Sequence, residues 1–244
     1  MAAPEPQATA AGSYTPILTD ATRLARVLVS PRAVFDEQRE KPTWFLPWLV
    51  VAIIVIVIGI FQTPYTMRTI ELALEARGST AQVPAGAMHT QAMIGSIVTP
   101  IFFLIFGAIG AGILYLILAV TGSSVRYRAM LSATIFSQAV LPIQFILQAV
   151  ILRLRGAPDV AISSIADAQP GLGLNLLLSA DATSSHFLTA LLGGIGPLPI
   201  WALIITAVGI MRLDKVKTGA AWTAALGSYV VLLLVAAGLA SLQR

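Results

Sequence analysis

Five long runs of apolar residues, separated by short stretches that hold nearly all the charges, constrain this chain more than any other feature. Each run is close to the roughly 20 residues that a helix needs to cross the hydrocarbon core of a bilayer. Lipid offers the backbone no hydrogen-bonding partner, so only helices or closed barrels cross it. The pattern predicts an all-α fold, a polytopic membrane helix bundle of five transmembrane helices, with spans at about residues 44–62, 93–120, 129–152, 186–211 and 220–242.

The composition favours a membrane protein and excludes several other classes. Of the 244 residues, 57% are hydrophobic and 11% are charged, whereas about 25% of residues are charged in a typical soluble domain. The net charge is +4, but the 15 Lys and Arg residues are scattered between the apolar runs, which favours membrane topology over nucleic-acid binding. The chain has no cysteine, which excludes disulfides, thiolate metal ligands and cysteine nucleophiles.

The region before the first run divides into two parts. Residues 1–19 are rich in Ala, Pro, Ser and Thr and are predicted to form a disordered tail. In residues 20–43 the apolar side chains recur at helical spacing, which is typical of amphipathic helices that lie on a membrane surface. Ser30 followed by Pro31 predicts a corner between two short helices, because serine caps helix starts and proline favours the first helical turn.

We expect these amphipathic interfacial helices to insert into the cytoplasmic leaflet. Burial of one apolar side chain contributes about 1.5 to 3 kcal/mol, and basic side chains are attracted to anionic headgroups. The alternative is that the segment only anchors the start of the first span. The residues expected at the membrane surface are Leu24, Leu28 and Phe35 in the apolar set, and Arg23, Arg26 and Arg32 in the basic set.

The distribution of Lys and Arg predicts the orientation of the chain. With five spans, the segments on the side of the N-terminus hold ten of these residues and the opposite side holds five. Basic residues accumulate in the cytoplasmic segments of membrane proteins. The N-terminus is therefore predicted to be cytoplasmic, and the C-terminus to lie on the opposite side.

Nothing in the spans predicts catalysis. Ionisable residues at membrane depth are costly and usually functional, and no Asp, Glu, Lys or Arg lies inside a predicted span. His89 and His186 fall near the ends of spans and are interpreted as interfacial side chains, because a zinc or proton-relay site needs further ligands nearby. We expect no enzyme activity, no cofactor, no metal site and no nucleic-acid partner.

The third span carries the most polar face at membrane depth. Thr134, Ser137, Gln144 and Gln148 lie at offsets of 0, 3, 10 and 14 residues, which places them on one face of a helix. Gln138 flanks this face. Polar side chains in spans commonly hydrogen-bond to neighbouring helices, and we favour that role over a groove for a lipid headgroup or a small solute.

The fourth span contains a candidate helix break at Gly196, Pro197 and Pro199. Proline removes a backbone donor and clashes with the preceding turn, so this group of residues predicts a kink or a broken helix. The ends of broken helices hold substrates in some transporters. We favour a structural kink, because neither a charge nor a matching broken span accompanies it.

Two parts of the chain resemble a known family of membrane proteins. The first comprises residues 28–35 (Leu-Val-Ser-Pro-Arg-Ala-Val-Phe) and 41–47 (Lys-Pro-Thr-Trp-Phe-Leu-Pro). It is similar to the amphipathic lead-in to the first span in the bacterial branch of the Yip family, the Ypt/Rab-interacting proteins. The second part runs from Phe187 through Ile200-Trp201 to Ala220-Ala221-Trp222 and resembles the last two spans of that family. Together the resemblance covers nearly everything after about Thr22.

The resemblance implies a non-enzymatic integral membrane protein with five spans. Eukaryotic members of the family bind prenylated Rab-type GTPases, act in membrane shaping and form homo- and hetero-oligomers. This chain lacks the Asp-Leu-Tyr-Gly-Pro type motif of those members, which makes GTPase binding doubtful. The family supplies no catalytic residue to transfer.

We therefore expect a scaffold in a bacterial inner membrane that organises the membrane or binds partner proteins. Its expected partners are the lipid bilayer and either other proteins or further copies of the same chain. The alternative is a transporter or permease subunit for a small solute or lipid. In that case the polar face of the third span and the break of the fourth would line its path.

Overall fold

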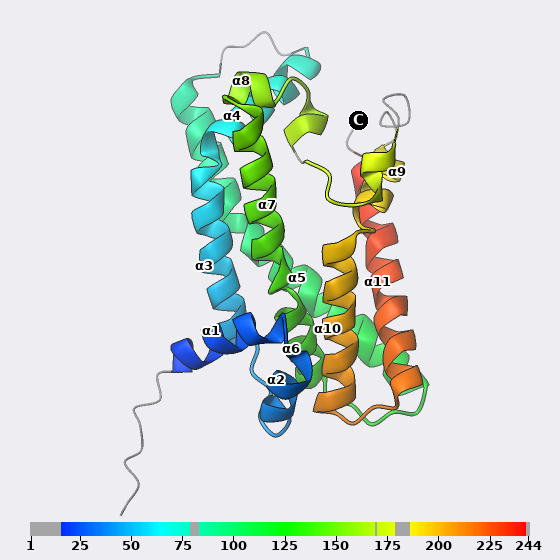
Figure 1. Ribbon diagram of the computed structural model, residues 1–244. Helices are drawn as coiled ribbons and strands as arrows, with labels where there is room; N and C mark the ends of the chain where they lie inside the picture. The colour runs from blue at the N-terminus through cyan, green and yellow to red at the C-terminus, as the bar shows by residue number, and fades with distance from the viewer. Residues whose placement is uncertain (1–15, 79–82, 169, 179–185, 243–244) are drawn as a thin grey trace, which may run out of the picture.

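A computed structural model describes residues 16–78, 83–168, 170–178 and 186–242, and every regular element within these ranges is helical (Figure 1). Three stretches are long and apolar enough to cross a membrane alone: α5 (Ala85–Val120), the combined stretch of α6 (Tyr127–Ser137) and α7 (Val140–Arg155), and α11 (Thr218–Ser241). The predicted all-α membrane helix bundle is confirmed.

Two further helix pairs pass the same test only as bent pairs, which raises the number of spans to five if each pair counts as one. The first joins α3 (Phe45–Phe61) to α4 (Thr63–Ala76) with a bend of 68°. The second joins α9 (His186–Gly193) to α10 (Pro197–Leu213) with a bend of 56°. Proline occupies the first turn of both α4 and α10, where its missing N–H costs nothing and its clash ends the preceding helix.

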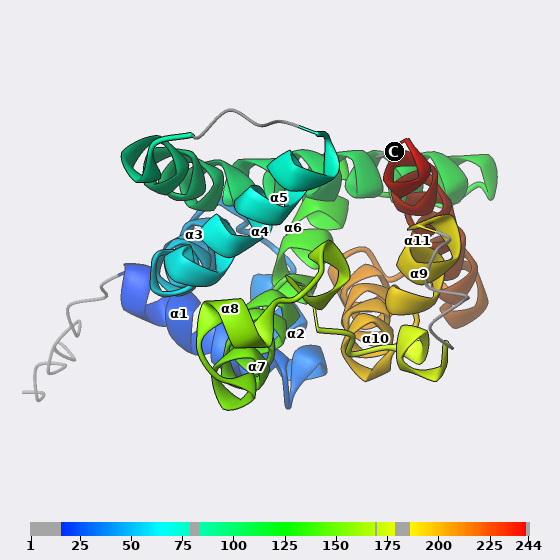
Figure 2. The same ribbon diagram turned by 90° about the horizontal axis from the view of Figure 1, so that it is seen from above.

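The longest helix, α5, lies obliquely across the bundle. Its 36 residues span about 54 Å at 1.5 Å per residue, well beyond the roughly 30 Å of a hydrocarbon core. Figures 1 and 2 show α5 running from the side of α3 and α4 to the side of α11. A helix of this length accommodates a bilayer by tilting, and its tilt lets one helix contact both halves of the bundle.

The core of the molecule centres on α6, which lies between α5 and α10 (Figure 2). Met130, Ile135 and Phe136 of α6 and Ile205 and Ile210 of α10 are fully buried. Small residues bring the two helices close, since a Cβ at Gly209 would lie only 2.7 Å from the Cβ of Ala133. Such close approach of backbones is the usual way in which helices associate in a membrane.

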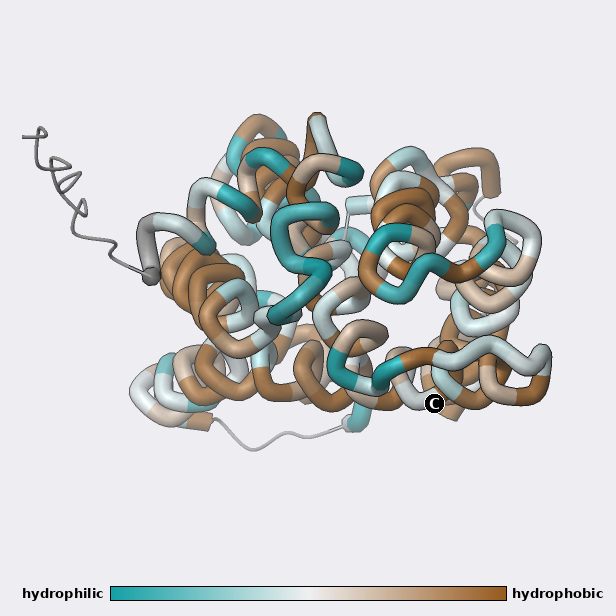
Figure 3. The backbone as a smooth tube through the Cα atoms, turned by 90° about the horizontal axis from the view of Figure 1, so that it is seen from below, coloured by the Kyte–Doolittle hydropathy of each residue, from teal (hydrophilic) through white to brown (hydrophobic). Residues whose placement is uncertain are grey.

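The two N-terminal helices, α1 (Pro16–Val27) and α2 (Pro31–Gln38), lie across one end of the bundle (Figure 1). We call this pair the cap. At the opposite end lie α4, α9 and the short helices α8 (Pro158–Ala161), η1 (Ile165–Ala168) and η2 (Leu174–Leu177). Seen from the cap end, hydrophilic segments gather in the cap and the adjoining turns, while the long helices are mostly hydrophobic (Figure 3).

The structure corrects the expectation that the apolar face of the cap inserts into lipid. Val27, Val34 and Phe35 are fully buried and Leu24 is 6% exposed, all within the main core cluster, and the half-buried Leu28 packs against the same cluster. Helical periodicity identifies an apolar face but not what covers it. Here α3 and α6 cover α1, and α10 covers α2. The predicted tail is corrected as well, since α1 already begins at Pro16; residues 1–15 lie outside the described residues.

Candidate functional site

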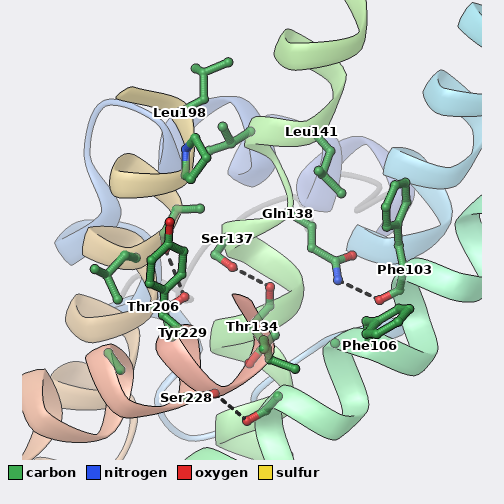
Figure 4. A pocket seen from close by; sticks show the side chains of 18 of the residues that line it. Phe103, Phe106, Thr134, Ser137, Gln138, Leu141, Leu198, Thr206, Ser228 and Tyr229 are labelled. Carbon is green, nitrogen blue, oxygen red and sulfur yellow. Dashed lines mark hydrogen bonds between the residues drawn. The ribbon is translucent and has the colours of Figure 1, made fainter. Parts of the chain in front are cut away.

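A cavity of about 300 Å³ lies inside the bundle among α5, α6, α7, α10 and α11 (Figure 4). Most of the side chains that line it are apolar, among them Phe103, Phe106, Leu141, Leu198 and Leu232. Ligand sites in proteins are typically concave, mostly apolar and of this volume or larger. The cavity is therefore the candidate site within the spans.

Two helix breaks create this cavity. The third span is interrupted at Gln138 and Ala139, between α6 and α7. The Pro142 ring in the following turn has no N–H to offer, and the carbonyl of Gln138 accepts from the N–H of Leu141 at 2.9 Å instead. The fourth span is interrupted between Gly193 and Pro197. Beyond these breaks α7 packs against α3, whereas α10 packs against α11 and keeps a smaller contact with α7 (Figure 1). The cavity lies between these diverging helices.

The cavity brings together three of the four residues of the polar face predicted on the third span. Thr134, Ser137 and Gln144 line the cavity, whereas Gln148 lies outside the lining and its Nε2 is 3.5 Å from the carbonyl oxygen of Pro170. The Thr134 hydroxyl donates to the carbonyl of Met130 at 2.9 Å, and the Ser137 hydroxyl donates to the carbonyl of Thr134 at 2.7 Å. These two hydroxyls therefore bond within α6 rather than to a neighbouring helix.

The interhelical bond from this span comes instead from Gln138, which the sequence placed only beside the face. Its Nε2 donates to the carbonyl oxygen of Phe103 on α5 at 2.9 Å. Gly107 makes room for the amide, because a Cβ at Gly107 would lie 2.7 Å from that Nε2. The Oε1 of Gln138 is buried without a hydrogen-bond partner. Pro142, four residues after Gln138, was the available signal that the helix breaks here.

Two further lining residues on α11 were missed by sequence reasoning. The Tyr229 hydroxyl donates to the carbonyl oxygen of Gly194 in the α9–α10 break, and the Ser228 hydroxyl donates to the carbonyl oxygen of Gly110 at 3.3 Å. Both donors thus bond to the backbone of another segment. The sequence shows two polar residues in an otherwise apolar helix, but their hydrogen-bond partners depend on how the helices pack.

The break at Gly196, Pro197 and Pro199 is closed by protein. The N–H of Leu174 donates to the carbonyl oxygen of Ile195 at 2.8 Å, and a Cβ at Gly196 would lie 2.8 Å from the carbonyl oxygen of Leu172. The segment that leads into η2 therefore packs directly onto the interrupted backbone. Pro199 lines the cavity, and Pro197 begins α10.

The cap is fixed to the bundle by a second set of polar contacts. The indole N–H of Trp201 on α10 donates to the carbonyl oxygen of Leu28 at 3.1 Å. Phe35 packs edge-on against Phe136 with ring centroids 5.8 Å apart. A Cβ at Gly209 would lie 3.0 Å from the Cζ of Phe35, so glycine is needed for this contact.

Gln38 is the most buried polar residue of the cap, with 1% of its surface exposed. Its Oε1 accepts hydrogen bonds from the backbone N–H and the hydroxyl of Thr43, both at 3.2 Å. The Ser132 hydroxyl lies 3.3 Å from the same oxygen and donates to the carbonyl of Thr43 at 2.7 Å. These bonds fix the turn between the cap and α3 against α6.

Arg126 and Asp214 join the turns at this end of the bundle. The Nε of Arg126 lies 2.8 Å from Oδ1 of Asp214, and the backbone N–H of Arg126 donates to Oδ2 at 2.7 Å. The guanidinium also donates to the carbonyl oxygens of Arg39 and Leu213 at 2.9 and 3.0 Å. One side chain thus links the end of the cap, the start of α6 and the end of α10.

The basic residues expected at the membrane surface differ in their contacts. Arg26 pairs with Glu37 at 2.7 Å, and Arg23 pairs with Asp20 at 3.1 Å and with Glu37 at 3.4 Å. The hydrogen bond from Arg26, followed by that from Arg23, holds the pKa of Glu37 below its usual value of 4.5 despite an opposing effect of burial. Arg32 is exposed.

The described residues hold no group of three or more His, Asp or Glu side chains placed to bind a metal ion. His89 on α5 and His186 on α9 are both exposed. The chemistry that the described sites offer is therefore contact with apolar groups in the cavity and with charged or apolar groups at the cap.

Comparison with known proteins places the chain in a family. Residues 25–242 match the Yip1 domain. The chain is also similar to membrane protein YknW of Bacillus subtilis (strain 168), with 24% identity over 223 residues that cover 88% of this chain and 89% of that protein. No solved structure matches the chain. Because the domain match extends from α1 to the end of α11, the chain belongs to the Yip1 domain family of membrane proteins.

Proposed function

We propose that this Yip1 protein is a non-enzymatic scaffold that binds partner proteins through the outer face of its cap. The observation that carries the proposal is the complete burial of the inner face of the cap, since Val27, Val34 and Phe35 are fully buried. A helix pair seated in this way presents its outer face in a fixed geometry. Fixed surfaces bind with a lower entropic cost than mobile ones.

The outer face of the cap has features of a contact surface. Val29, at the corner between α1 and α2, is 80% exposed, and Arg32 is exposed one turn further along. An exposed apolar side chain beside an arginine is a common combination at protein interfaces. The proposed partner is a protein, or a second copy of this chain, that buries Val29 and places a carboxylate near Arg32.

The proposal places the cap in the cytoplasm of a bacterium and the bundle in its inner membrane. Of the described Lys and Arg residues, ten lie at the cap end: in the cap and just after it, at the start of α6, and at the end of α10 with the turn that follows. Four lie toward the opposite end. This asymmetry supports a cytoplasmic cap. Cysteine labelling from either side of sealed membranes tests it, and a label that reaches Val29→Cys only from the outside would reverse the orientation.

Photo-cross-linking in native membranes tests the scaffold. A photoreactive amino acid at Val29 is expected to give a discrete protein adduct that disappears when Arg32 is changed to Glu. The same charge reversal at Arg77, an exposed arginine after α4 at the other end, is the matched control and should leave the adduct unchanged. A product of twice the mass of this chain identifies a second copy as the partner. Adducts with lipid alone, or adducts unaffected by Arg32→Glu, would overturn the proposal.

A transporter or permease subunit is the second candidate, because Gln144 lines a cavity inside the spans. The test is labelling of Gln144→Cys in membranes by a water-soluble thiol reagent, and the natural chain has no cysteine that would interfere. Leu154→Cys, at a position that is 82% exposed at the end of α7, serves as the labelled control. If Gln144→Cys stays unlabelled, the water-filled path that a transporter needs is absent.

A further inference from the structure

We propose that the cavity among α5, α6, α7, α10 and α11 binds one aliphatic chain of a membrane lipid, which enters beside Phe106. This binding site is independent of the proposed scaffold role, since it lies inside the spans and the partner surface lies on the cap. Its position, its lining and its volume each support the same occupant.

The cavity reaches the lipid-facing surface near the middle of a span. Phe106 lines the cavity and is also 37% exposed on the outside of α5. It is the 22nd of the 36 residues of this helix, and the neighbouring Phe102, Ile105 and Ile109 are about half exposed. A surface of this composition faces lipid chains. The opening therefore meets the inner parts of lipid chains rather than headgroups or water.

The lining favours an apolar ligand over a polar solute. None of the described lining residues is Asp, Glu, Lys, Arg or His. The hydroxyls of Ser137, Thr206, Ser228 and Tyr229 already donate to backbone carbonyls, as Figure 4 shows for those of Ser137 and Ser228. A polar solute would have to replace these bonds or bond to the Gln144 amide, which also lines the cavity, whereas an aliphatic chain needs neither. Apolar cavities in proteins exclude water and accept apolar ligands.

The volume admits part of a lipid but not a whole one. At roughly 30 Å³ for a water-sized group, about 300 Å³ holds about ten such groups, comparable to a chain segment of about ten carbons. The glycerol and headgroup of the lipid then remain outside, at the surface of the membrane. An acyl chain that enters from the adjoining leaflet moves from one apolar environment to another, so no desolvation is required.

Photoreactive phospholipids test the site in the full-length protein. Two probes carry a diazirine either at the end of one acyl chain or near the glycerol, and both are mixed into vesicles that contain the purified protein. The chain-end probe is expected to modify inward-facing lining residues such as Thr134 and Ala202. The glycerol-proximal probe should modify only residues outside the cavity. Peptide mapping by mass spectrometry reads the sites.

A variant that fills the cavity provides the specificity test. Ala202→Phe is expected to abolish the adducts on Thr134 while the adducts on Ile105 and Ile109, outside the cavity, persist. The matched control is Ala236→Phe, which adds the same ring to an exposed position of α11 and should leave all adducts as in the natural protein. If Ala202→Phe does not fold, native mass spectrometry of the unmodified protein should still show one retained phospholipid per chain.

Three results would overturn the proposal. These are adducts confined to outward-facing residues in the natural protein, equal modification of the lining by both probes, and adducts on Thr134 that persist in Ala202→Phe. None of them bears on the cross-link from Val29, so failure of the lipid site and failure of the scaffold are distinguishable.

Discussion

The cap end of the bundle and the cavity differ in how completely side chains fill the space between helices. At the cap end, fully buried side chains such as Phe35 fill that space, and long-range bonds such as the one from Trp201 to Leu28 fix the helices to one another. Around the cavity, some hydroxyls bond within their own helix, as that of Thr134 does, and others bond to another segment, as that of Ser228 does, yet about 300 Å³ stays open between the helices. Tight filling, rather than the kind of hydrogen bond, therefore distinguishes the cap end from the cavity.

The largest effect expected from this contrast is the loss of the Phe35 ring. Phe35→Ala should lower the free energy of unfolding by about 3 kcal/mol, because truncating a fully buried aromatic side chain removes its contacts and leaves a void. Denaturant unfolding in detergent, followed by tryptophan fluorescence, measures it. Phe45→Ala, at a position that is 52% exposed, is the control with little expected change. Equal losses for the two variants would contradict the burial of the cap.

Two leucines, one at the cap end and one at the cavity, differ in how completely they are buried. Leu213, near the cap end of α10, is 1% exposed, and Leu213→Ala should cost about 3 kcal/mol. Leu141 is half-buried at the cavity, and Leu141→Ala should cost only about 1 kcal/mol, since part of its surface already faces open space. Unfolding of both variants in one detergent gives the ratio. A larger loss at Leu141 would mean that the cavity is closed in solution.

Loss of the Gln38 amide should have an intermediate effect. Gln38→Ala leaves the partly buried N–H of Thr43 without its acceptor, which should lower the free energy of unfolding by about 1 to 2 kcal/mol. Gln91→Ala, at an exposed position of α5, is the matched control and should be neutral. Hydrogen exchange at Thr43 supplies an independent readout, and unchanged protection there would show that the Gln38 bond contributes nothing.

The smallest effect concerns the pH dependence of the cap. The folded-state pKa of Glu37 is lowered below 4.5, so its stabilising contribution is fully present above about pH 4.5 and disappears as the pH falls through the lowered pKa. Because the pair with Arg26 is exposed, the loss should not exceed about 0.5 kcal/mol. The measurement compares unfolding of the natural protein and of Glu37→Gln at neutral pH and below pH 4. Identical pH dependence of the two proteins would contradict the prediction.

The sequence predicted the helical elements well, because apolar runs and breakers act locally. The corner at Ser30 and Pro31 separates α1 from α2, and Pro197 begins α10 after the break. The interruption at Gln138 was not predicted, although Pro142 lies one turn further on. Proline inside a span is often tolerated by a continuous helix, so its effect depends on the helices around it.

The partners of side chains could not be predicted in the same way. The apolar face of the cap was evident, but its burial by α3, α6 and α10 rather than by lipid depends on tertiary packing. Thr134 and Gln144 of the predicted polar face line the cavity, but Gln148, one turn beyond Gln144, lies outside its lining. Arg126 and Asp214 are 88 residues apart. From the sequence, the charge of each residue indicated only on which side of the membrane its segment lies. Such pairings arise from the fold and leave no local pattern.

The contact between Trp201 and Leu28 also has a consequence for biosynthesis. These residues are separated by 173 positions, and Phe35 likewise contacts Gly209. Ribosomes add residues from the N-terminus onward, so α1 and α2 leave the ribosome long before α10 is translated. Until then the apolar faces of α1 and α2 cannot pack against α10. The nascent segment must therefore be shielded by the translocation machinery, by lipid or by a chaperone. The helices made first are among the last to reach their final positions.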